Sequence, residues 1–261
     1  MAHTPHGPRL VLATDLDDTL VGEPDGLQAL WHALDRLEPH RLLYLTGRSL
    51  ESAQGLMHEV GLRTPDVLVT DVGTQVWRPS AGGAFVEDEA WAARLDAEWD
   101  GPRVDAAVRR VEGLEPQPVR PSRFRASFWL TRPEAQVVPR LRRALERAGL
   151  SVQIIVSAGV NVDLLPPPAG KGAALRYLVE QGGWPEEAVL ACGDSGNDRS
   201  MLEAGFRAVV VGGYRPELES LRGRPRLHFA QARAAWGILE GLEHHGWPTT
   251  SHPPSTVTKS S

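Results

Sequence analysis

Short apolar runs that end in a polar residue or in glycine recur along the chain, and they constrain the fold more than any other feature. Runs of this kind are typical of parallel strands that are buried on both faces of a sheet. They lie at 10–15, 41–47, 66–71, 188–194 and 207–213.

Segments with helical patterning lie between these runs, at 26–37, 49–60, 172–180 and 197–204. The alternation of strands and helices predicts an α/β fold, a doubly wound Rossmann-like parallel sheet. Ligands of such sheets bind at the carboxyl ends of the strands, where Asp15, Thr46 and Asp194 fall. These side chains are therefore predicted to converge on one crevice.

The alternation stops after Asp71, and this break predicts an inserted α+β module, a cap, at 87–165. We expect a core made of 1–86 and 166–247, followed by a disordered Pro/Ser/Thr-rich tail at 248–261. The patterns between Asp71 and the end of the module predict a hairpin, two helices and three strands. In chain order these are the hairpin at 72–88, a helix at 91–112, a strand at 123–131, a helix at 134–148 and two strands within 151–166.

Composition excludes several classes of protein. The 261 residues are 41% hydrophobic, which is enough for a sizeable core, and the formal net charge of -5 gives no overall electrostatic case for nucleic acid. The single cysteine, Cys192, excludes an internal disulfide framework, and we interpret it as a small core residue. No apolar stretch has the length of a signal peptide core or a membrane span, so we expect a cytoplasmic protein without a membrane partner.

Three acidic residues, Asp15, Asp17 and Asp18, follow the first apolar run directly. Carboxylates this close repel one another, so a strand that ends in them requires an explanation. Taken alone, the triplet is better explained as a polar turn, because Asp is common in turns and at helix starts.

Four motifs together resolve that ambiguity. They are "DLDDT" at 15–19, "TGRS" at 46–49, Lys171 before a helix, and "GDSGND" at 193–198. Their order and their placement at strand ends resemble the haloacid dehalogenase superfamily of phosphotransferases. The resemblance covers the whole predicted α/β core.

The chemistry of the acidic residues agrees with this resemblance. A carboxylate can attack a phosphoryl group and form an aspartyl-phosphate, and we assign that nucleophile to Asp15. Asp17 can protonate the departing alcohol and then deprotonate the water that hydrolyses the intermediate. Carboxylates beside a phosphate dianion need a hard cation with oxygen ligands to offset the repulsion, and Mg²⁺ suits that role.

The resemblance implies a set of metal ligands. They are a side-chain oxygen of Asp15, the backbone carbonyl of Asp17 and the side chain of Asp194. Asp198 is expected to act from further out, by holding a bound water or Lys171.

The resemblance also implies a phosphate site. Thr46 is expected to donate a hydrogen bond to a phosphate oxygen, and Lys171 to neutralise charge as the phosphoryl group moves. Backbone N–H groups around Asp17, Asp18 and Gly47 would complete the cradle. For Asn197, a direct functional contact and a turn-capping role remain equally open.

Longer segments resemble the sucrose-phosphate phosphatase family more closely. They are "ATDLDDTLVG", "LTGRSLESAQGL", "PDVLVTDVGTQVW", "VDLLPPPAGKGAALRYL" and "LACGDSGND". In that family the insert is a cap that closes over the strand ends and selects the sugar. The implied activity is hydrolysis of sucrose 6-phosphate to sucrose and phosphate. Gln75 departs from the family pattern, which usually has Glu at this position.

The cap offers three further candidates for contact with a sugar. Strand alternation in 160–164 places Asn161 and Asp163 on one face, where they could hydrogen-bond sugar hydroxyls. A polar edge strand without a ligand explains the same pattern equally well. Arg125 could likewise meet an anionic or polyhydroxyl ligand or be an exposed strand residue.

The core chemistry does not depend on the leaving alcohol, so other functions remain open. Mannosylglycerate phosphate and mannosylfructose phosphate are the alternative substrates. A hexose-phosphate mutase is less favoured, because it must retain and return the phosphoryl group rather than pass it to water. A non-catalytic sugar-phosphate sensor is also less favoured, because a pure binder gains little from an acid/base such as Asp17. We expect a monomer, with association with a sugar-phosphate synthase as an open option.

Overall fold

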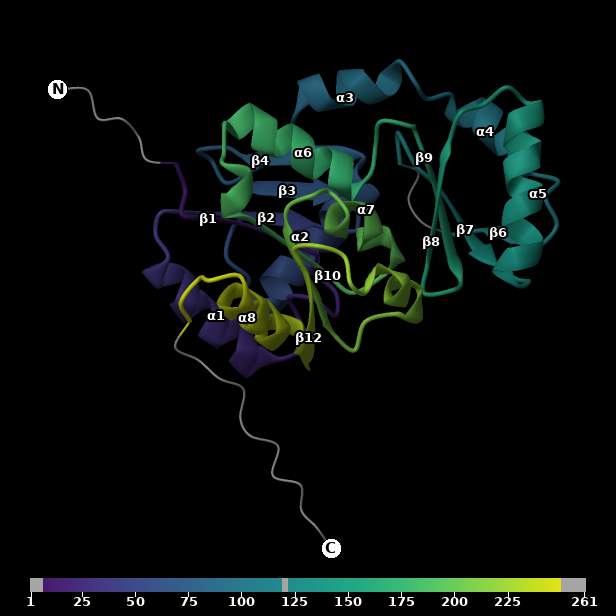
Figure 1. Ribbon diagram of the computed structural model, residues 1–261. Coiled ribbons are helices and arrows are strands. Elements are labelled where there is room, and N and C mark those ends of the chain that lie inside the picture. Colours follow the sequence, from purple (N-terminus) through teal and green to yellow (C-terminus); the bar gives the residue numbers. More distant parts are fainter. Residues whose placement is uncertain (1–6, 119–121, 250–261) are drawn as a thin grey trace, which may run out of the picture.

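A computed structural model describes residues 7–118 and 122–249. Its largest element is an eight-stranded sheet with the order β12-β11-β10-β1-β2-β3-β4-β5 (Figure 1). Neighbouring strands from β12 to β3 pair in parallel, and β4 and β5 extend the sheet as an antiparallel hairpin. The strands are β1 Leu10–Thr14, β2 His40–Leu45, β3 Val67–Thr70, β4 Gln75–Pro79, β5 Phe85–Glu87, β10 Val189–Gly193, β11 Arg207–Gly212 and β12 Leu227–Arg233. The predicted doubly wound parallel sheet is confirmed.

Helices cover both faces of this sheet. Helices α1, α2 and α8 pack on one face, and α3, α6 and α7 pack on the other (Figure 1). The central strands are therefore apolar on both sides, which explains why β1, β3 and β10 read as unbroken apolar runs. The helices are α1 Pro24–Arg36, α2 Leu50–Val60, α3 Glu89–Asp96, α6 Lys171–Gly182, α7 Arg199–Leu202 and α8 Ala234–His244.

A second, antiparallel sheet with the order β6-β7-β9-β8 forms the cap. Helices α4 (Gly101–Val108) and α5 (Glu134–Arg147) pack on one face of it, around Phe128, Val162 and Leu164 (Figure 1). The strands are β6 Leu114–Pro116, β7 Ala126–Leu130, β8 Gln153–Ser157 and β9 Asn161–Leu165.

The opposite face of the cap sheet is turned toward the core. Phe124 is fully buried in the cluster that lies on the α6 side of the large sheet, and Ile155 packs against the same cluster. At the outer end of β8, the Ala158 N–H donates to Glu217 of the core at 2.8 Å. Apolar packing and polar contacts thus hold the cap over the strand ends.

The structure differs from the sequence prediction within the insert. The helix expected at 91–112 is two helices, α3 and α4, because the Asp100 side chain accepts the Arg103 N–H and caps a new helix that has Pro102 in its first turn. The strand expected at 123–131 begins only at Ala126. The proposed boundary at 86/87 falls within β5, because Glu87 still pairs with Trp77.

Within the described ranges, no helix has the length and apolar character to cross a membrane. The part of the proposed tail at 250–261 lies outside the described residues.

Candidate active site

The carboxyl ends of β1, β2 and β10 meet at one edge of the large sheet. In register, Thr14 of β1 pairs with Cys192 of β10 on one side and Tyr44 of β2 on the other. Asp15 continues the ladder, with its N–H donating to the Cys192 carbonyl at 3.0 Å. The predicted convergence of Asp15, Asp194 and Thr46 on one edge follows from this alignment.

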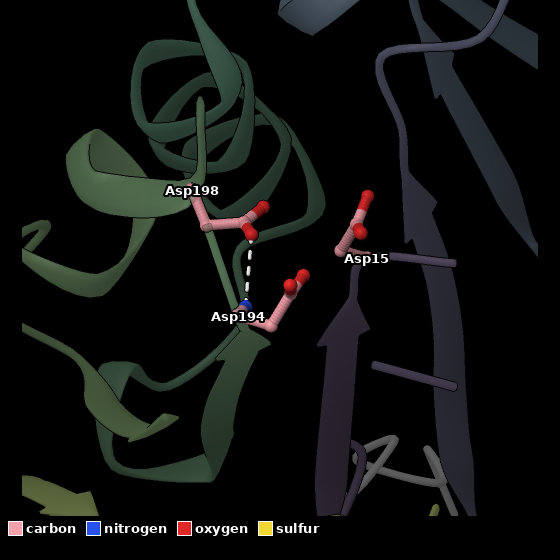
Figure 2. A group of neighbouring side chains, drawn as sticks. All are labelled: Asp15, Asp194 and Asp198. Atoms are coloured by element: carbon pink, nitrogen blue, oxygen red, sulfur yellow. Dashed lines mark hydrogen bonds between the residues drawn. The ribbon is translucent and has the colours of Figure 1, made fainter. Parts of the chain in front are cut away.

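Three buried carboxylates gather there. Each of Asp15, Asp194 and Asp198 offers an oxygen atom, and these atoms lie within 4.8 Å of one another. Figure 2 shows the three carboxylates around one space, with Asp15 at the end of β1 and Asp194 and Asp198 in the segment that follows β10. Their exposed fractions are 5%, 4% and 0%, so water screens their mutual repulsion poorly.

Lys171, the first residue of α6, is a fully buried cation within this cluster. Its Nζ donates to Asp15 Oδ1 at 2.7 Å and to Asp198 Oδ1 at 2.6 Å. Burial disfavours the charged ammonium, but the two adjacent carboxylates outweigh this effect and raise the pKa of Lys171. Lys171 therefore stays positively charged between the two aspartates.

Asp198 is held by the turn that follows β10. Its Oδ2 accepts the N–H groups of Asp194 and Ser195, both at 3.0 Å, while Oδ1 accepts from Lys171. Gly193 makes this turn possible, because a Cβ there would lie 2.4 Å from the Cβ of Asp198. Both oxygens of Asp198 are thus engaged by protein donors, whereas the Asp194 carboxylate accepts, among the described residues, only from Thr19 Oγ1 at 3.1 Å.

The charge balance of this cluster fits a divalent cation. Burial, followed by repulsion from Asp198, raises the pKa of Asp194 to about 7, and burial also raises the pKa of Asp15. One lysine cannot neutralise three buried carboxylates, and hard divalent cations bind carboxylate oxygens. Asp15 and Asp194 therefore fit as ligands. Asp198 fits a role in orienting Lys171 and the turn.

The raised pKa values predict how the stability of the metal-free protein depends on pH. The folded protein keeps protons on Asp194 and Asp15 that the unfolded chain has released, so stability should fall as pH rises from about 5 to about 8. Thermal melting of chelated protein across this range checks the expectation. Asp194→Asn, which removes the titrating group, should flatten the curve, and Mg²⁺ should raise the melting temperature more at the alkaline end. A wild-type curve that rises over this range would contradict the assignment.

Thr46 and Gly47 form a loop directly after β2. The buried Thr46 Oγ1 accepts the Arg48 N–H at 3.1 Å, which leaves its own proton for a ligand. A Cβ on Gly47 would lie 3.5 Å from the Asn197 Nδ2, so the Asn197 amide sits beside the loop. Its Oδ1 is buried and has no hydrogen-bond partner. The Asn197 amide therefore lies beside the loop after β2, and a direct functional contact for it stays a prediction.

Asp17 and Asp18 occupy the turn after Asp15. Asp18 adopts a left-handed backbone, with φ of 56°, and its exposed side chain pairs with Arg215 at 3.3 Å. The Asp17 carboxylate forms a two-point ion pair with Arg48, with Oδ2 at 2.8 Å from Nε and Oδ1 at 2.7 Å from Nη2. Arg48 was not among the residues predicted for the site, although it lies inside the "TGRS" motif.

The cap candidates are bound to other protein groups. As predicted, Asn161 and Asp163 lie on the face of β9 opposite Val162 and Leu164. The Asn161 Oδ1 accepts from Gln117 at 3.0 Å, and the Asp163 Oδ1 accepts from Ser127 at 2.6 Å.

Arg125 is not an exposed strand residue. It immediately precedes β7, its side chain is only 9% exposed, and it reaches across to the core.

Gln75, the residue that departs from the family pattern, is the first residue of β4. Its Oε1 accepts from Thr70 Oγ1 at 3.5 Å, and Thr70 also accepts from the Trp77 Nε1 at 2.9 Å. Gln75 and Trp77 line a pocket of about 280 Å³ between the start of α2 and residues 122–123 of the cap. The uncharged amide thus faces a small crevice at the cap–core junction.

Comparison with known proteins identifies the family. The family model for sucrose-6F-phosphate phosphohydrolase matches residues 8–246. Sucrose-phosphatase 2 of Nicotiana tabacum is 33% identical over 93% of this chain, but the chain spans only 61% of that protein. Mannosylfructose-phosphate phosphatase of Agrobacterium fabrum is 33% identical, and the match covers 92% of this chain and 98% of that protein.

A solved structure agrees with these matches. The sucrose-phosphatase of Synechocystis sp. PCC6803, determined in complex with sucrose and phosphate, superimposes with a TM-score of 0.85 at 36% identity. The superposition covers 91% of this chain and 98% of that one. More distant structures share the haloacid dehalogenase fold. On this evidence, the chain belongs to the sucrose-6F-phosphate phosphohydrolase family.

Proposed function

We propose that the protein is a Mg²⁺-dependent phosphatase that hydrolyses sucrose 6-phosphate to sucrose and phosphate through an aspartyl-phosphate. The observation that carries the proposal is the buried cluster in which Lys171 joins Asp15 to Asp198 at the ends of β1 and β10. This arrangement places a carboxylate nucleophile beside a fixed positive charge, which suits attack on a dianionic phosphate.

In the first step an oxygen of Asp15 attacks phosphorus, the bond from phosphorus to the sugar oxygen breaks, and Asp17 gives that oxygen a proton. In the second step Asp17 takes a proton from water, whose oxygen attacks phosphorus and releases Asp15 and inorganic phosphate. Asp17 follows Asp15 by two residues, so the same turn places the acid/base next to the nucleophile.

A cation held by Asp15, Asp194 and the backbone carbonyl of Asp17 would supply charge neutralisation for the phosphate. Lys171 keeps a positive charge beside Asp15 through both steps. The geometry of Thr46, with its hydroxyl proton left free by the Arg48 N–H, supports a hydrogen bond to a phosphate oxygen. Asn197 and the backbone at Gly47 and Asp18 would complete the cradle.

The choice of sucrose 6-phosphate rests on the relatives. The tobacco relative is named a sucrose-phosphatase, and the Synechocystis structure holds sucrose and phosphate. Mannosylfructose phosphate is the second candidate, because the Agrobacterium phosphatase matches this chain over nearly its whole length. Both candidates are phosphorylated disaccharides that contain fructose, so a cap that recognises the second sugar would distinguish them.

Phosphate release from a panel of substrates tests the proposal. Sucrose 6-phosphate should have a kcat/KM roughly 10- to 100-fold above glucose 6-phosphate or fructose 6-phosphate, because a monosaccharide forgoes contacts worth about 1–3 kcal/mol. Mannosylfructose phosphate belongs in the panel, and a preference for it would transfer the assignment to the second candidate. Equal rates on all sugars would contradict a sugar-selecting cap.

We further propose a monomeric, cytoplasmic enzyme with a sugar-phosphate synthase as its partner in the cell. Such a synthase is the class of enzyme that makes the phosphorylated disaccharide. The synthase proposal therefore depends on the substrate proposal.

A further inference from the structure

One arginine of the cap makes direct contact with the loop that follows β2. Arg125 Nη1 donates to the Gly47 carbonyl at 2.8 Å, and Nη2 lies 2.7 Å from Asp71 Oδ1. Gly47 and Asp71 belong to the core, whereas Arg125 directly precedes strand β7 of the cap. Both contacts must break when the cap moves away from the core.

The Gly47–Arg48 peptide is fixed on both sides. Arg125 holds its carbonyl, and its N–H donates to Thr46 Oγ1 at 3.1 Å. The next carbonyl, that of Arg48, accepts the Asp71 N–H at 2.9 Å. Arg125 and its partner Asp71 therefore determine the backbone orientation from which the Arg48 side chain projects.

The Arg48 side chain in turn fixes Asp17. Two of its nitrogens hold the two carboxylate oxygens of Asp17 at 2.8 and 2.7 Å, and Nη1 donates to Ser52 Oγ at 2.9 Å. A two-point pair of this kind defines the plane of the carboxylate as well as its position. The only carboxylate proposed to exchange protons with the leaving group is thus oriented by Arg48.

We infer that Arg125 is a positioning residue: through Gly47 and Arg48 it couples the closed cap to the orientation of Asp17. The inference rests on the proposed phosphatase function. It adds that closure of the cap orients the carboxylate that exchanges protons with the leaving group. Arg125 acts without touching the substrate, in contrast to the sugar contact considered for it from the sequence.

The junction between Arg125 and the core is buried. Asp163 Oδ1 also lies 3.9 Å from Arg125, so one guanidinium faces two buried carboxylates. Burial raises the pKa of Asp71 and of Asp163, while Arg125 acts in the opposite direction. Withdrawing Arg125 would leave both carboxylates without this partner, so these contacts favour the arrangement in which the guanidinium stays between them.

The dependence of the rate on the leaving group distinguishes a role of Arg125 in positioning Asp17 from a role in contacting the sugar. Glycerol 2-phosphate has a poor alkoxide leaving group, so its hydrolysis needs a proton from Asp17. 4-Nitrophenyl phosphate has a good leaving group, so its hydrolysis depends little on that proton. Neither carries a second sugar ring for Arg125 to contact. The readout is the ratio of kcat/KM for the two substrates, which is independent of the fraction of folded enzyme because both are measured on one sample.

We expect Arg125→Gln to lower this ratio by about tenfold, since general acid catalysis supplies roughly 10²–10⁴ and only its orientation is disturbed. Arg125→Lys keeps the charge but cannot bridge both acceptors, so it should give an intermediate ratio and remains informative if the Gln variant does not fold. Arg132→Gln is the matched control, because Arg132 pairs with Glu112 at 3.2 Å entirely within the cap. Its ratio should equal that of wild type.

The double variant Arg48→Gln/Arg125→Gln tests whether Arg125 acts on Asp17 through Arg48. Arg48→Gln should lower the ratio further than Arg125→Gln, and adding Arg125→Gln to Arg48→Gln should change it by less than about twofold. Losses that multiply, an unchanged ratio in both Arg125 variants, or a loss confined to sucrose 6-phosphate would each overturn the inference. Wild-type protein that hydrolyses no phosphomonoester would instead overturn the proposed function.

Discussion

Replacing Asp15 with Asn is expected to reduce phosphate release from sucrose 6-phosphate by at least about 10⁴-fold, because the amide cannot form the aspartyl-phosphate. The side chain keeps its size and can still approach Lys171, so binding of substrate should be much less affected than turnover. Steady-state kinetics, together with trapping of the phosphorylated intermediate on wild type and variant, measures the effect.

The same substitution should leave the metal-free fold at least as stable as wild type. Asp15 is one of three carboxylates buried around a single lysine, and burial raises its pKa. Replacing it with a neutral amide removes a carboxyl group whose charged form is disfavoured by burial, while Asp198 remains to pair with Lys171 at 2.6 Å. Thermal melting of chelated samples checks this part, and a large loss of stability would show that Asp15 supports the fold.

Asp35→Asn is a suitable control for this experiment. Asp35 is an exposed carboxylate of the same size on α1 that pairs with Arg63 and belongs to none of the four motifs. Its substitution should leave turnover within about twofold of wild type, as expected for a surface change. If folded Asp15→Asn kept near-native turnover, the nucleophile would have to be another residue.

The core of the fold could be predicted because its strands are buried on both faces. Runs such as 10–15 and 188–194 must then be apolar throughout, and this pattern is visible without any partner. The convergence of Asp15, Thr46 and Asp194 follows equally from sequence, since parallel strands bring their carboxyl ends to one edge.

Elements whose patterns depend on tertiary contacts could not be predicted. Strand β12 lies at the edge of the sheet and is only partly buried, with a register shift against β11. Helix α8 contains two glycines, which are poor helix formers. A Cβ on Gly241 would lie 2.1 Å from Val209, so this glycine serves close packing of the helix on β11.

The hydrogen-bond and ion-pair partners of the site residues could not be predicted from the sequence either. The pair between Asp17 and Arg48 joins residues 31 positions apart, and Arg125 reaches Gly47 across 78 positions. A motif can indicate that Asp17 needs an orienting group, but the choice of arginine depends on how the loop after β2 lies against the turn after β1. Only the folded cap–core junction supplies that information.

Removal of divalent cations is expected to abolish turnover, and Mg²⁺ is expected to restore it. Asp15, Asp194 and Asp198 lie within 4.8 Å of one another, and a phosphate dianion would add two further negative charges to a site with one lysine. Unscreened repulsion of this size would prevent both substrate binding and attack by Asp15. Phosphate release from chelated enzyme, followed by titration with Mg²⁺, measures the effect.

Asp194→Asn separates loss of the cation from loss of the fold. An amide oxygen is a weaker ligand than a carboxylate, so this variant should need a Mg²⁺ concentration roughly 10- to 100-fold higher for half-maximal activity. Thr19 Oγ1 can still donate to the amide oxygen, which preserves the local hydrogen bond. Asp35→Asn, with its carboxylate outside the cluster, should titrate as wild type does. Undiminished turnover by rigorously chelated wild-type enzyme would show that Lys171 alone supports the reaction, and the assigned role of the acidic cluster would then be wrong.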